Sequence, residues 1–389
     1  MMGDSSIQQI HATPGLWVMA ITGGGSAAIS RLLAVPGASR TLVEAAVPYH
    51  NQALQAYLGY KPRQACSPTT ARALAMAAFR RCQQLQAAEA PTPPAPTETV
   101  PASPVFGLGC SAALTTDRSR RGQDRCFVAV QSLAASWEFS LQLQALGRSR
   151  ETQELLCSEL VIAAISHAQA GPVLNLQNLT QALPSLATDD QLSARCEVAP
   201  QPWQALFEGL ATSTWTGPEQ PRGIFPGAFN PLHAGHRTML DLARATLGHE
   251  VVLEISAFNV DKPPLDYLDM RARQAGAAGQ PLVFSNTPTF AEKSLIFPGA
   301  TFVVGSDTIE RIADPRYYGG LAANRDAAIA LLQRRGHRFL VFGRSDGKGF
   351  IGLEQLPLPA SLAAICDGVP EAQFRIDIAS RDLRQATDE

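Results

Sequence analysis

The sequence predicts an α/β protein made of two α/β domains. Its 389 residues exceed the usual size of a single hydrophobic core, so the chain is expected to divide. From residue 222 onward, short apolar runs alternate with segments of helical periodicity, which predicts a parallel, doubly wound sheet. Strand-like and alanine-rich helical segments also follow one another before residue 170. We therefore predict domains at residues 1–170 and 222–389, joined by a linker over residues 171–221.

The composition is that of an ordinary globular protein whose partners are recognised by local sites. Apolar residues make up 46% of the chain, and a formal net charge of −2 provides no general attraction for nucleic acid or anionic membranes. No apolar run approaches the roughly 20 residues that cross a bilayer, and the first residues lack a secretion signal. The seven cysteines have neither disulfide nor zinc spacing. We expect a cytoplasmic protein with no nucleic acid, membrane or resident metal as partner, and a homo-oligomer stays open.

The amino-terminal region begins with an apolar run at residues 16–21, which predicts a buried strand. A glycine turn at residues 23–25 and a helix over residues 27–34 follow. A strand, a glycine turn and a helix start can hold an anion, and packing explains such glycines equally well. Further strands are predicted over residues 105–110 and 126–130, and helices over residues 69–85 and 150–168. Residues 88–104 are rich in proline, which cannot continue a helix, and are predicted to form an extended insertion.

The carboxy-terminal region contains five apolar runs with the length of buried strands, at residues 223–225, 251–255, 281–284, 301–304 and 338–342. Helical periodicity is expected between them, at residues 237–243, 265–277 and 324–335. Because the carboxyl ends of parallel strands meet at one edge of a sheet, ligands are expected at the loops that follow these strands.

The loop after the first of these strands has the composition of a phosphate-binding turn. It reads Gly227-Ala228-Phe229-Asn230-Pro231-Leu232 and leads into His233-Ala234-Gly235-His236 at the start of a helix. Free backbone N–H groups at a helix start, with the helix dipole behind them, hold an anion. His233 and His236 lie on one face of the first turn, so both can donate hydrogen bonds to the same phosphate. The alternative is a β–α turn whose histidines only cap the helix and contribute to packing.

This stretch resembles the His-x-Gly-His signature of the nucleotidylyltransferase superfamily, whose cytidylyltransferase-like α/β fold joins a nucleoside triphosphate to a phosphate-bearing acceptor. Its Phe229-Asn230-Pro231 version is most similar to nicotinamide or nicotinate mononucleotide adenylyltransferases. The resemblance implies a Rossmann-like domain over residues 222–389, with His233 and His236 as catalytic residues. It implies nucleotide contacts for the loop residues Gly227, Ala228, Phe229 and Asn230.

Three further segments resemble motifs of the same superfamily. Residues 259–264, in the loop after the second strand, resemble a Lys-rich Pro loop, which implies that Lys262 binds a phosphate as a point charge; the alternative is an ordinary surface lysine. Gly305 and Asp307 resemble a Gly-x-Asp segment, in which the glycine permits close approach of the nucleotide and the aspartate accepts from ribose hydroxyls or caps the next helix. Ser380 and Arg384 resemble the Ile-Ser-Ser-Thr-x-Ile-Arg motif, which implies a phosphate-binding serine and a catalytic arginine one turn later.

The implied reaction transfers AMP from ATP to the 5′-phosphate of nicotinamide or nicotinate mononucleotide and releases pyrophosphate, as in NAD biosynthesis. ATP and a small phosphate-bearing acceptor are the implied partners, with Mg²⁺ carried in on the nucleotide. Ala379 and Arg381 depart from the serine and threonine of the last motif, which removes one hydroxyl and adds a cation. The alternatives are a phosphopantetheine-like acceptor, CTP as donor, or a nucleotide-binding regulator without turnover.

Residues 7–170 resemble the carboxy-terminal domain of competence-damage-inducible proteins, which has the fold of nicotinamide-nucleotide amidohydrolase. The resemblance rests on Thr22-Gly23-Gly24, Val35-Pro36-Gly37-Ala38-Ser39, Tyr49-His50-Asn51 and Gly59. The family's nucleophilic serine stands where this chain has Ala20, and its lysine stands where this chain has Leu54. Because alanine has no oxygen to attack an amide carbon, the resemblance implies the fold without the chemistry. Nucleotide binding by Arg118, Arg120, Arg121 or Arg125, or an assembly role, remains open.

Overall fold

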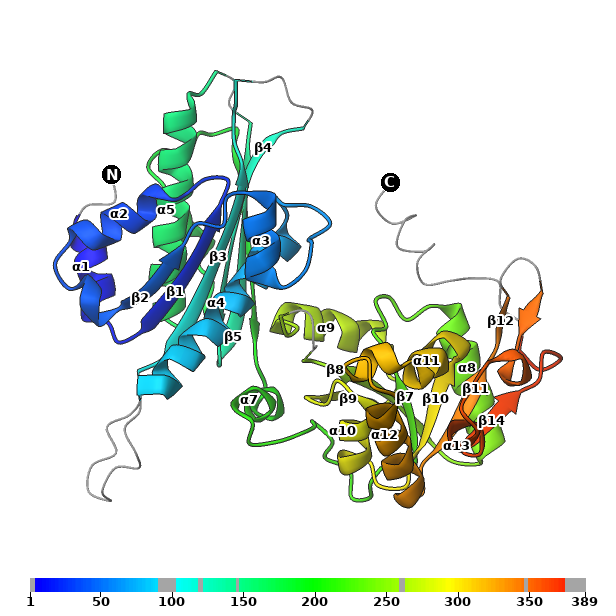
Figure 1. The fold of residues 1–389 in the computed structure, drawn as a ribbon. Coiled ribbons are helices and arrows are strands. Elements are labelled where there is room, and N and C mark those ends of the chain that lie inside the picture. The colour runs from blue at the N-terminus through cyan, green and yellow to red at the C-terminus, as the bar shows by residue number, and fades with distance from the viewer. Residues whose placement is uncertain are drawn as a thin grey trace, which may run out of the picture. The chain divides into compact units, whose positions relative to one another are not determined.

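The computed structural model describes residues 4–89, 103–117, 122–144, 147–258, 263–345 and 349–374. Contacts between Cα atoms divide the chain into two compact units, each of which contains a central sheet (Figure 1). Unit 1 comprises Met1–Gln204 and Asn259–Met270, and unit 2 comprises Ala205–Phe258 and Arg271–Glu389. Residues 259–270, which lie within the predicted carboxy-terminal domain, therefore group with unit 1.

Unit 1 is built on a mixed six-stranded sheet in the order β2-β1-β3-β4-β5-β6. Its strands are β1 (Leu16–Thr22), β2 (Leu42–Ala46), β3 (Val105–Ala113), β4 (Asp124–Ser132), β5 (Ala135–Leu143) and β6 (Gln191–Val198). Strand β1 is parallel to β2 and β3, and the remaining neighbours are antiparallel. The helices are α1 (Asp4–Ala12), α2 (Ala27–Ala34), η1 (Ala38–Arg40), α3 (Asn51–Leu58), α4 (Pro68–Glu89), α5 (Arg150–Gln169) and α6 (Leu176–Gln181), and α7 (Gln201–Glu208) follows β6.

Helices cover both faces of this sheet because side chains alternate along its central strands. Met19 and Ile21 join the core formed with α1, α2 and α5, whereas Ala20 contacts α3 and α4. Helix α4 approaches β3 closely (Figure 1). A Cβ atom added at Gly109 would lie 2.1 Å from the carbonyl oxygen of Ala71, so glycine at this position is what allows the close approach.

A buried ionic cluster in unit 1 holds the returning segment 263–270. The Arg72 guanidinium lies 3.3 Å from a carboxylate oxygen of Glu138, 3.5 Å from one of Asp266 and 3.0 Å from one of Asp269. Burial raises the pKa of Asp266 to about 6; Arg72 opposes this rise, and the charges of Asp269 and Glu138 add to it. Three carboxylates around one buried cation thus hold this segment, and burial makes Asp266 bind a proton more tightly than an exposed aspartate does.

Unit 2 is built on an all-parallel six-stranded sheet in the order β14-β11-β10-β7-β8-β9. Its strands are β7 (Gly223–Pro226), β8 (Val251–Ser256), β9 (Leu282–Ser285), β10 (Thr301–Gly305), β11 (Arg338–Phe342) and β14 (Cys366–Val369). Its helices are α8 (Ala234–Leu247), α9 (Tyr267–Gly276, whose first residues belong to unit 1), α10 (Phe290–Ile296), α11 (Ser306–Ala313), η2 (Pro315–Tyr318), α12 (Ala322–Arg334), η3 (Leu353–Gln355) and α13 (Ala360–Ala363). Strands β12 (Arg344–Ser345) and β13 (Phe350–Ile351) form a separate antiparallel pair.

The strand order of unit 2 confirms the predicted Rossmann-like, doubly wound sheet. Numbered along the chain within this unit, the sheet reads 6-5-4-1-2-3, so the direction in which strands are added reverses between β7 and β10. The apolar strands of the prediction form the core with α11 and α12, as illustrated by Ile224, Phe302, Ile309, Ile329 and Phe339. In such sheets, ligands bind outside the carboxyl ends of the strands at the point of reversal.

Four strands of the two six-stranded sheets are absent from the sequence prediction, namely β2, β5, β6 and β14, and so is the separate pair β12–β13. Strand β5 carries Glu138 among buried residues, and β14 contains Asp367 and Gly368, so neither resembles an apolar strand. Strand β6 lies inside residues 171–221, the predicted linker, and pairs with β5 over its whole length. Pairing with a neighbouring strand stabilises these segments, and local propensity does not reveal it.

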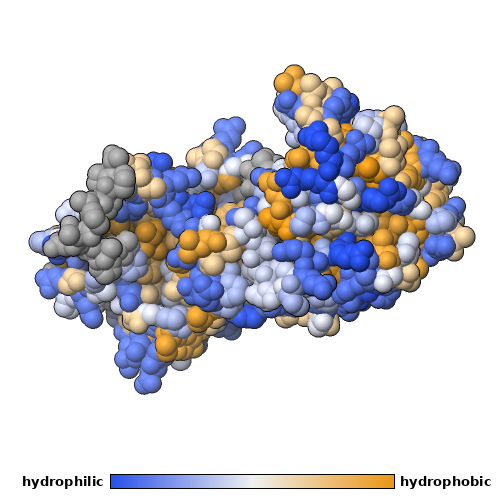
Figure 2. Space-filling model, turned by 90° about the horizontal axis from the view of Figure 1, so that it is seen from below, coloured by the Kyte–Doolittle hydropathy of each residue, from blue (hydrophilic) through white to orange (hydrophobic). Residues whose placement is uncertain are grey.

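The described helices and one face of the surface (Figure 2) can be compared with what a membrane protein would present. None of the helices within the described ranges has both the length and the apolarity required to cross a membrane. The face drawn in Figure 2 intersperses hydrophobic with hydrophilic residues. Highly exposed apolar side chains, such as Val173 and Leu210, are separated along the chain, which is common on protein surfaces.

Candidate functional site

The predicted phosphate-binding loop joins β7 to α8 and starts at the reversal of strand order. The N–H of Gly227 donates to the carbonyl oxygen of Glu254 at 2.9 Å, which ties the loop to β8. Phe229 is buried and has φ of 43°, a left-handed value that is rare for a bulky residue. Its ring lies 2.5 Å from where a Cβ on Gly227 would be. Ala228 and Asn230 are exposed, and the buried Phe229 ring lies between them in the sequence.

The structure brings together the two predicted catalytic histidines. His233 is the N-cap residue of α8, and its ring stacks on that of His236 with centroids 3.7 Å apart and planes inclined by 25°. The backbone N–H of His233 donates to Nδ1 of His236 at 3.4 Å. The ring of His236 also meets the rings of Phe229 and Phe225 edge to face, at centroid distances of 5.1 and 6.1 Å. The imidazoles are therefore held by stacking, by the helix start and by the phenylalanines beneath them.

The surroundings of both histidines favour the neutral imidazole. Burial lowers the pKa of His236 to about 4, and the charge of a protonated His233 contributes further. Burial also lowers the pKa of His233. Because Nδ1 of His236 accepts a hydrogen bond, the single proton of the neutral ring is assigned to Nε2. This arrangement leaves an N–H donor at the amino end of a 14-residue helix, where backbone N–H groups also attract an anion.

The second half of the site follows β10, the neighbour of β7 across the reversal. Gly305 caps α11 with φ of −83°, and a Cβ added there would meet no atom within 4 Å. Neither backbone conformation nor packing requires glycine here, and the space beside the strand end is open. Asp307 lies in the first turn of α11, where its Oδ1 forms an ion pair with Arg344. The loops after β7 and β10 therefore lie on either side of the reversal of strand order, at the sheet edge where ligands bind in such folds.

Three of the predicted site residues, Lys262, Ser380 and Arg384, lie outside the described residues. Their placement relative to the histidine pair stays a prediction.

Two arginines at this edge are absent from the sequence prediction. Arg273 of α9 donates to the carbonyl oxygen of Ala228, within the phosphate-binding loop. Arg344 follows β11 and pairs with Asp307. Arg344 carries one sequence signal, because it comes two residues after an apolar strand, at the sheet edge where ligands bind. The contact of Arg273 depends on tertiary packing and has no such signal.

A buried charge pair supports the carboxyl ends of β8 and β9. Lys293 of α10 lies 2.8 Å from Oε1 of Glu254, and the side chains of both are at most 4% exposed. The ammonium also donates to Ser256 Oγ and to the Thr287 carbonyl oxygen, each at 2.7 Å, while Ser285 donates to Glu254 Oε1. Within the described part of the chain, Glu254 Oε2 has no hydrogen-bond partner. The pair holds the strand to which Gly227 is bonded, and it is too deeply buried to meet a ligand.

The described side chains of this site do not form a protein cage for a metal ion. Within the described ranges, no three His, Cys, Asp or Glu side chains are grouped so that they could hold one. The two imidazoles suit phosphate oxygens as N–H donors, and Asp307 is already engaged by a cation. This donor set fits a Mg²⁺ ion held mainly by nucleotide phosphates, which keeps several of its waters.

In unit 1, the glycine turn that could hold an anion is occupied by the protein's own carboxylate. Glu154 of α5 accepts from the N–H of Gly25 at 2.8 Å, from the Ser26 hydroxyl at 3.1 Å and from the N–H of Ala27 at 3.0 Å. Ala20, at the position of the family's nucleophile, is fully buried. The donors of Gly25, Ser26 and Ala27 are therefore engaged by the protein's own carboxylate, and no hydroxyl stands at position 20. Arg125 donates to the Cys66 carbonyl oxygen at 3.4 Å, while residues 118–121 lie outside the described ranges.

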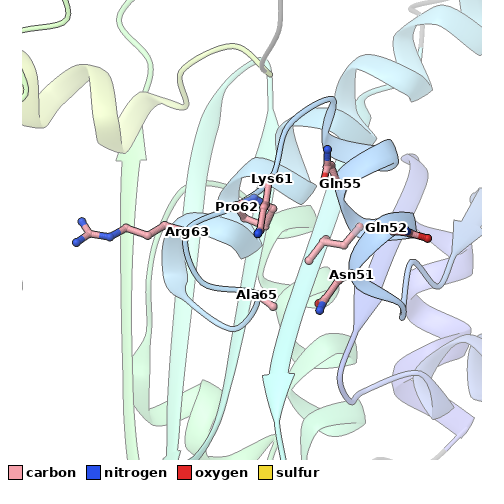
Figure 3. A pocket seen from close by; sticks show the side chains of 8 residues that line it. Asn51, Gln52, Gln55, Lys61, Pro62, Arg63 and Ala65 are labelled. Atoms are coloured by element: carbon pink, nitrogen blue, oxygen red, sulfur yellow. The ribbon is translucent and has the colours of Figure 1, made fainter.

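A cavity of about 390 Å³ lies beside α3 in unit 1 (Figure 3). Its lining consists of Asn51, Gln52, Leu54, Gln55, Lys61, Pro62, Arg63 and Ala65. None of these side chains carries a hydroxyl or a thiol. In Figure 3, the side chains of Arg63 and Gln52 point away from the other lining residues. The lining therefore contains no hydroxyl or thiol nucleophile, and Lys61 and Arg63 are its charged side chains.

Comparison with known proteins identifies one domain. Residues 224–345 match the protein-family model described as cytidylyltransferase-like, which confirms the resemblance of the carboxy-terminal region to that group. The match includes the histidine pair, Asp307 and Arg344, and it supports a nucleotidyltransferase.

The solved structures that resemble the chain include two from the competence-damage group. One is the competence/damage inducible protein CihA from Agrobacterium tumefaciens, at 14% identity and a TM-score of 0.30, covering 46% of this chain and 95% of that one. The other is a competence-damaged protein (CinA) superfamily protein from Escherichia coli, at 14% identity and a TM-score of 0.26, covering 43% and 84%. No curated protein matches the sequence.

Proposed function

We propose that the cytidylyltransferase-like domain transfers the adenylyl group of ATP to the 5′-phosphate of nicotinamide or nicotinate mononucleotide, as a step of NAD biosynthesis in the cytoplasm. The observation that carries the proposal is the stacked pair His233–His236 at the start of α8, beside the reversal of strand order. The Phe229-Asn230-Pro231 sequence supports a pyridine mononucleotide as acceptor through its resemblance to that branch. Seven cysteines without a disulfide are consistent with a reducing compartment.

In the proposed reaction, an oxygen of the acceptor phosphate attacks the α-phosphorus of ATP in line. The bond from that phosphorus to the bridging oxygen of the β-phosphate breaks, and pyrophosphate leaves with the electron pair. Since the attacking phosphate is already anionic, the protein need supply neither a base nor a covalent nucleophile. Its contribution is to hold two anions in line and to stabilise charge on the phosphoryl oxygens. Mg²⁺ enters as part of the MgATP substrate and neutralises phosphate charge.

Each described residue has a role that its contacts support. Nε2–H of His236 and the ring of His233 donate to triphosphate oxygens, together with the first N–H groups of α8. Gly305 leaves room for the nucleotide, and Asp307 accepts from its ribose. We assign the outer phosphates to Lys262, Ser380 and Arg384 on the resemblance of their motifs.

The test is an assay of pyrophosphate release by the purified full chain with MgATP and nicotinamide or nicotinate mononucleotide. We expect turnover that His236→Asn reduces about 10²- to 10³-fold, the usual effect of losing one preorganised donor to the transition state. The matched control is His249→Ala, because His249 lies just beyond the other end of α8. Thermal unfolding of each variant separates lost chemistry from lost structure.

Assays with other acceptors and donors distinguish this proposal from the alternative substrates and from a nucleotide-binding regulator. Turnover only with 4′-phosphopantetheine would identify a different acceptor, and turnover only with CTP would identify a different donor. In both cases the reaction would still be nucleotidyl transfer. ATP binding without turnover on any acceptor would make the domain a nucleotide-binding regulator. If the wild-type chain neither binds nor turns over a nucleotide, the proposal is wrong.

A further inference from the structure

Arg344 and Asp307 are placed together by the register of the sheet. Strands β10 and β11 are parallel, and Gly305 at the end of β10 is paired with Phe342 at the end of β11. Asp307 and Arg344 each follow two residues later, so both leave the sheet at its ligand-binding edge. Nη1 of Arg344 contacts Oδ1 of Asp307, and Nη2 lies 3.8 Å from Oε2 of Glu310, one turn further along α11. One guanidinium thus serves two carboxylates.

The contact has a specific electrostatic consequence for an anionic ligand. Asp307 and Glu310 place two negative charges on the first turns of α11, beside the open space at Gly305. Two uncompensated carboxylates there would repel a nucleoside triphosphate. The side chains of Arg344 and Asp307 are 45% and 55% exposed, so a ligand can reach this pair. The ion pair engages Oδ1 of Asp307, so the oxygen that would meet a hydroxyl is Oδ2.

We propose that Arg344 is a positioning residue for the ribose of the nucleotide. It holds one oxygen of Asp307, so that the other accepts hydrogen bonds from the ribose hydroxyls, and it neutralises the carboxylates that the polyphosphate approaches. Arg344 itself need not touch the reacting phosphorus. The inference rests on the proposed function of this domain and adds to it the group that selects a ribonucleotide over a deoxyribonucleotide.

A matched control lies at the other end of the same strand. Arg338 begins β11 and pairs with Asp367 at 2.7 Å, with side chains 48% and 56% exposed. This pair has the chemistry and exposure of the Arg344–Asp307 pair, but it lies at the amino edge of the sheet, away from the ligand-binding loops. Any general effect of deleting an exposed arginine pair on this strand appears in Arg338→Ala as well.

The experiment measures binding and turnover of ATP, 2′-deoxyATP and 3′-deoxyATP by the wild-type chain, Arg344→Ala, Arg344→Lys and Arg338→Ala. We expect Arg344→Ala to raise KM for ATP about tenfold while kcat changes little, the effect of losing one charge-assisted contact. We also expect the preference for ATP over one deoxy analogue to fall towards unity. Arg344→Lys restores part of the KM, because it keeps the charge without the fork. Arg338→Ala stays within about twofold of the wild type.

A second variant tests the route through Asp307. If Arg344 acts on the ribose through this carboxylate, Asp307→Asn lowers the same preference, and adding Arg344→Ala to it lowers the preference no further. An equal loss of affinity for ATP and both deoxy analogues in Arg344→Ala, or parity with Arg338→Ala, overturns the inference while the proposed function stands. Absence of nucleotide binding by the wild-type chain overturns both.

Discussion

The backbone N–H of His233 donates to Nδ1 of His236 across 3.4 Å, and the two imidazole rings stack with centroids 3.7 Å apart. This relationship fixes the protonation of the site as well as its geometry. With Nδ1 engaged as an acceptor, the neutral ring of His236 carries its proton on Nε2.

His236 is expected to stay neutral throughout the range in which histidine usually titrates. Burial lowers its pKa from 6.5 to about 4. Because the folded value lies below the unfolded one, this group's contribution to stability is present above about pH 6.5 and is lost as pH falls towards 4. Histidine ¹⁵N spectra of the free protein should report an unprotonated Nδ1 and a protonated Nε2 at pH 7. A titration midpoint near 6.5 for this ring would contradict the assignment.

Alanine is predicted to have different effects at two glycines of the site, lowering stability at Gly227 and weakening ATP binding at Gly305. A Cβ at Gly227 would lie 2.5 Å from the Phe229 ring, so Gly227→Ala must displace the ring that supports His236. We expect a loss of about 1–3 kcal/mol in the free energy of unfolding. At Gly305 the space is open, so Gly305→Ala should change stability by less than about 1 kcal/mol yet weaken ATP binding.

Urea unfolding and ATP titration of both variants give the comparison. Equal stability losses, or unchanged ATP binding by Gly305→Ala, would contradict this assignment of the two positions.

Replacing one partner of the buried pair Glu254–Lys293 is predicted to lower the free energy of unfolding more than replacing both partners does. Lys293→Met leaves a carboxylate buried without its cation, so we expect unit 2 to lose about 3–5 kcal/mol. The double variant Glu254→Gln/Lys293→Met should lose less, because no uncompensated charge remains. The exposed pair Arg338–Asp367 is the control, since such pairs contribute at most about 1 kcal/mol. Denaturant midpoints measure all three, and a loss in the double variant as large as that in Lys293→Met would refute the coupling.

Asp266 is expected to stabilise unit 1 in mild acid and to lose this contribution as the pH rises. Burial raises its pKa from 3.8 to about 6, so the folded state holds this proton more tightly than the unfolded chain. The contribution is therefore present below about pH 4 and is lost as pH rises through 6. The stability of the wild type relative to Asp266→Asn should fall between pH 4.5 and 7. A difference that stays constant over this range would show that Asp266 is already ionised at its lower end.

The local patterns predicted the site's own loop better than they predicted its partners. The helix start at His233, the open position at Gly305 and the first-turn aspartate all lie where the sequence places them, because glycine, proline and helix-capping preferences act within a few residues. Strands β5 and β6 escaped prediction because pairing stabilises them. Arg273 escaped because its contact with the loop joins residues 45 positions apart.

By itself the sequence determined the alternation of strands and helices after residue 222, and with it a parallel sheet carrying two histidines on the first turn of a helix. These features follow from periodicity and from chemistry within one turn of chain. Only the tertiary structure decided that the loop after β7 lies beside the loop after β10, that Arg344 reaches Asp307, and that His236 is buried enough to stay neutral. Those facts depend on strand order and desolvation, which arise when distant segments pack together.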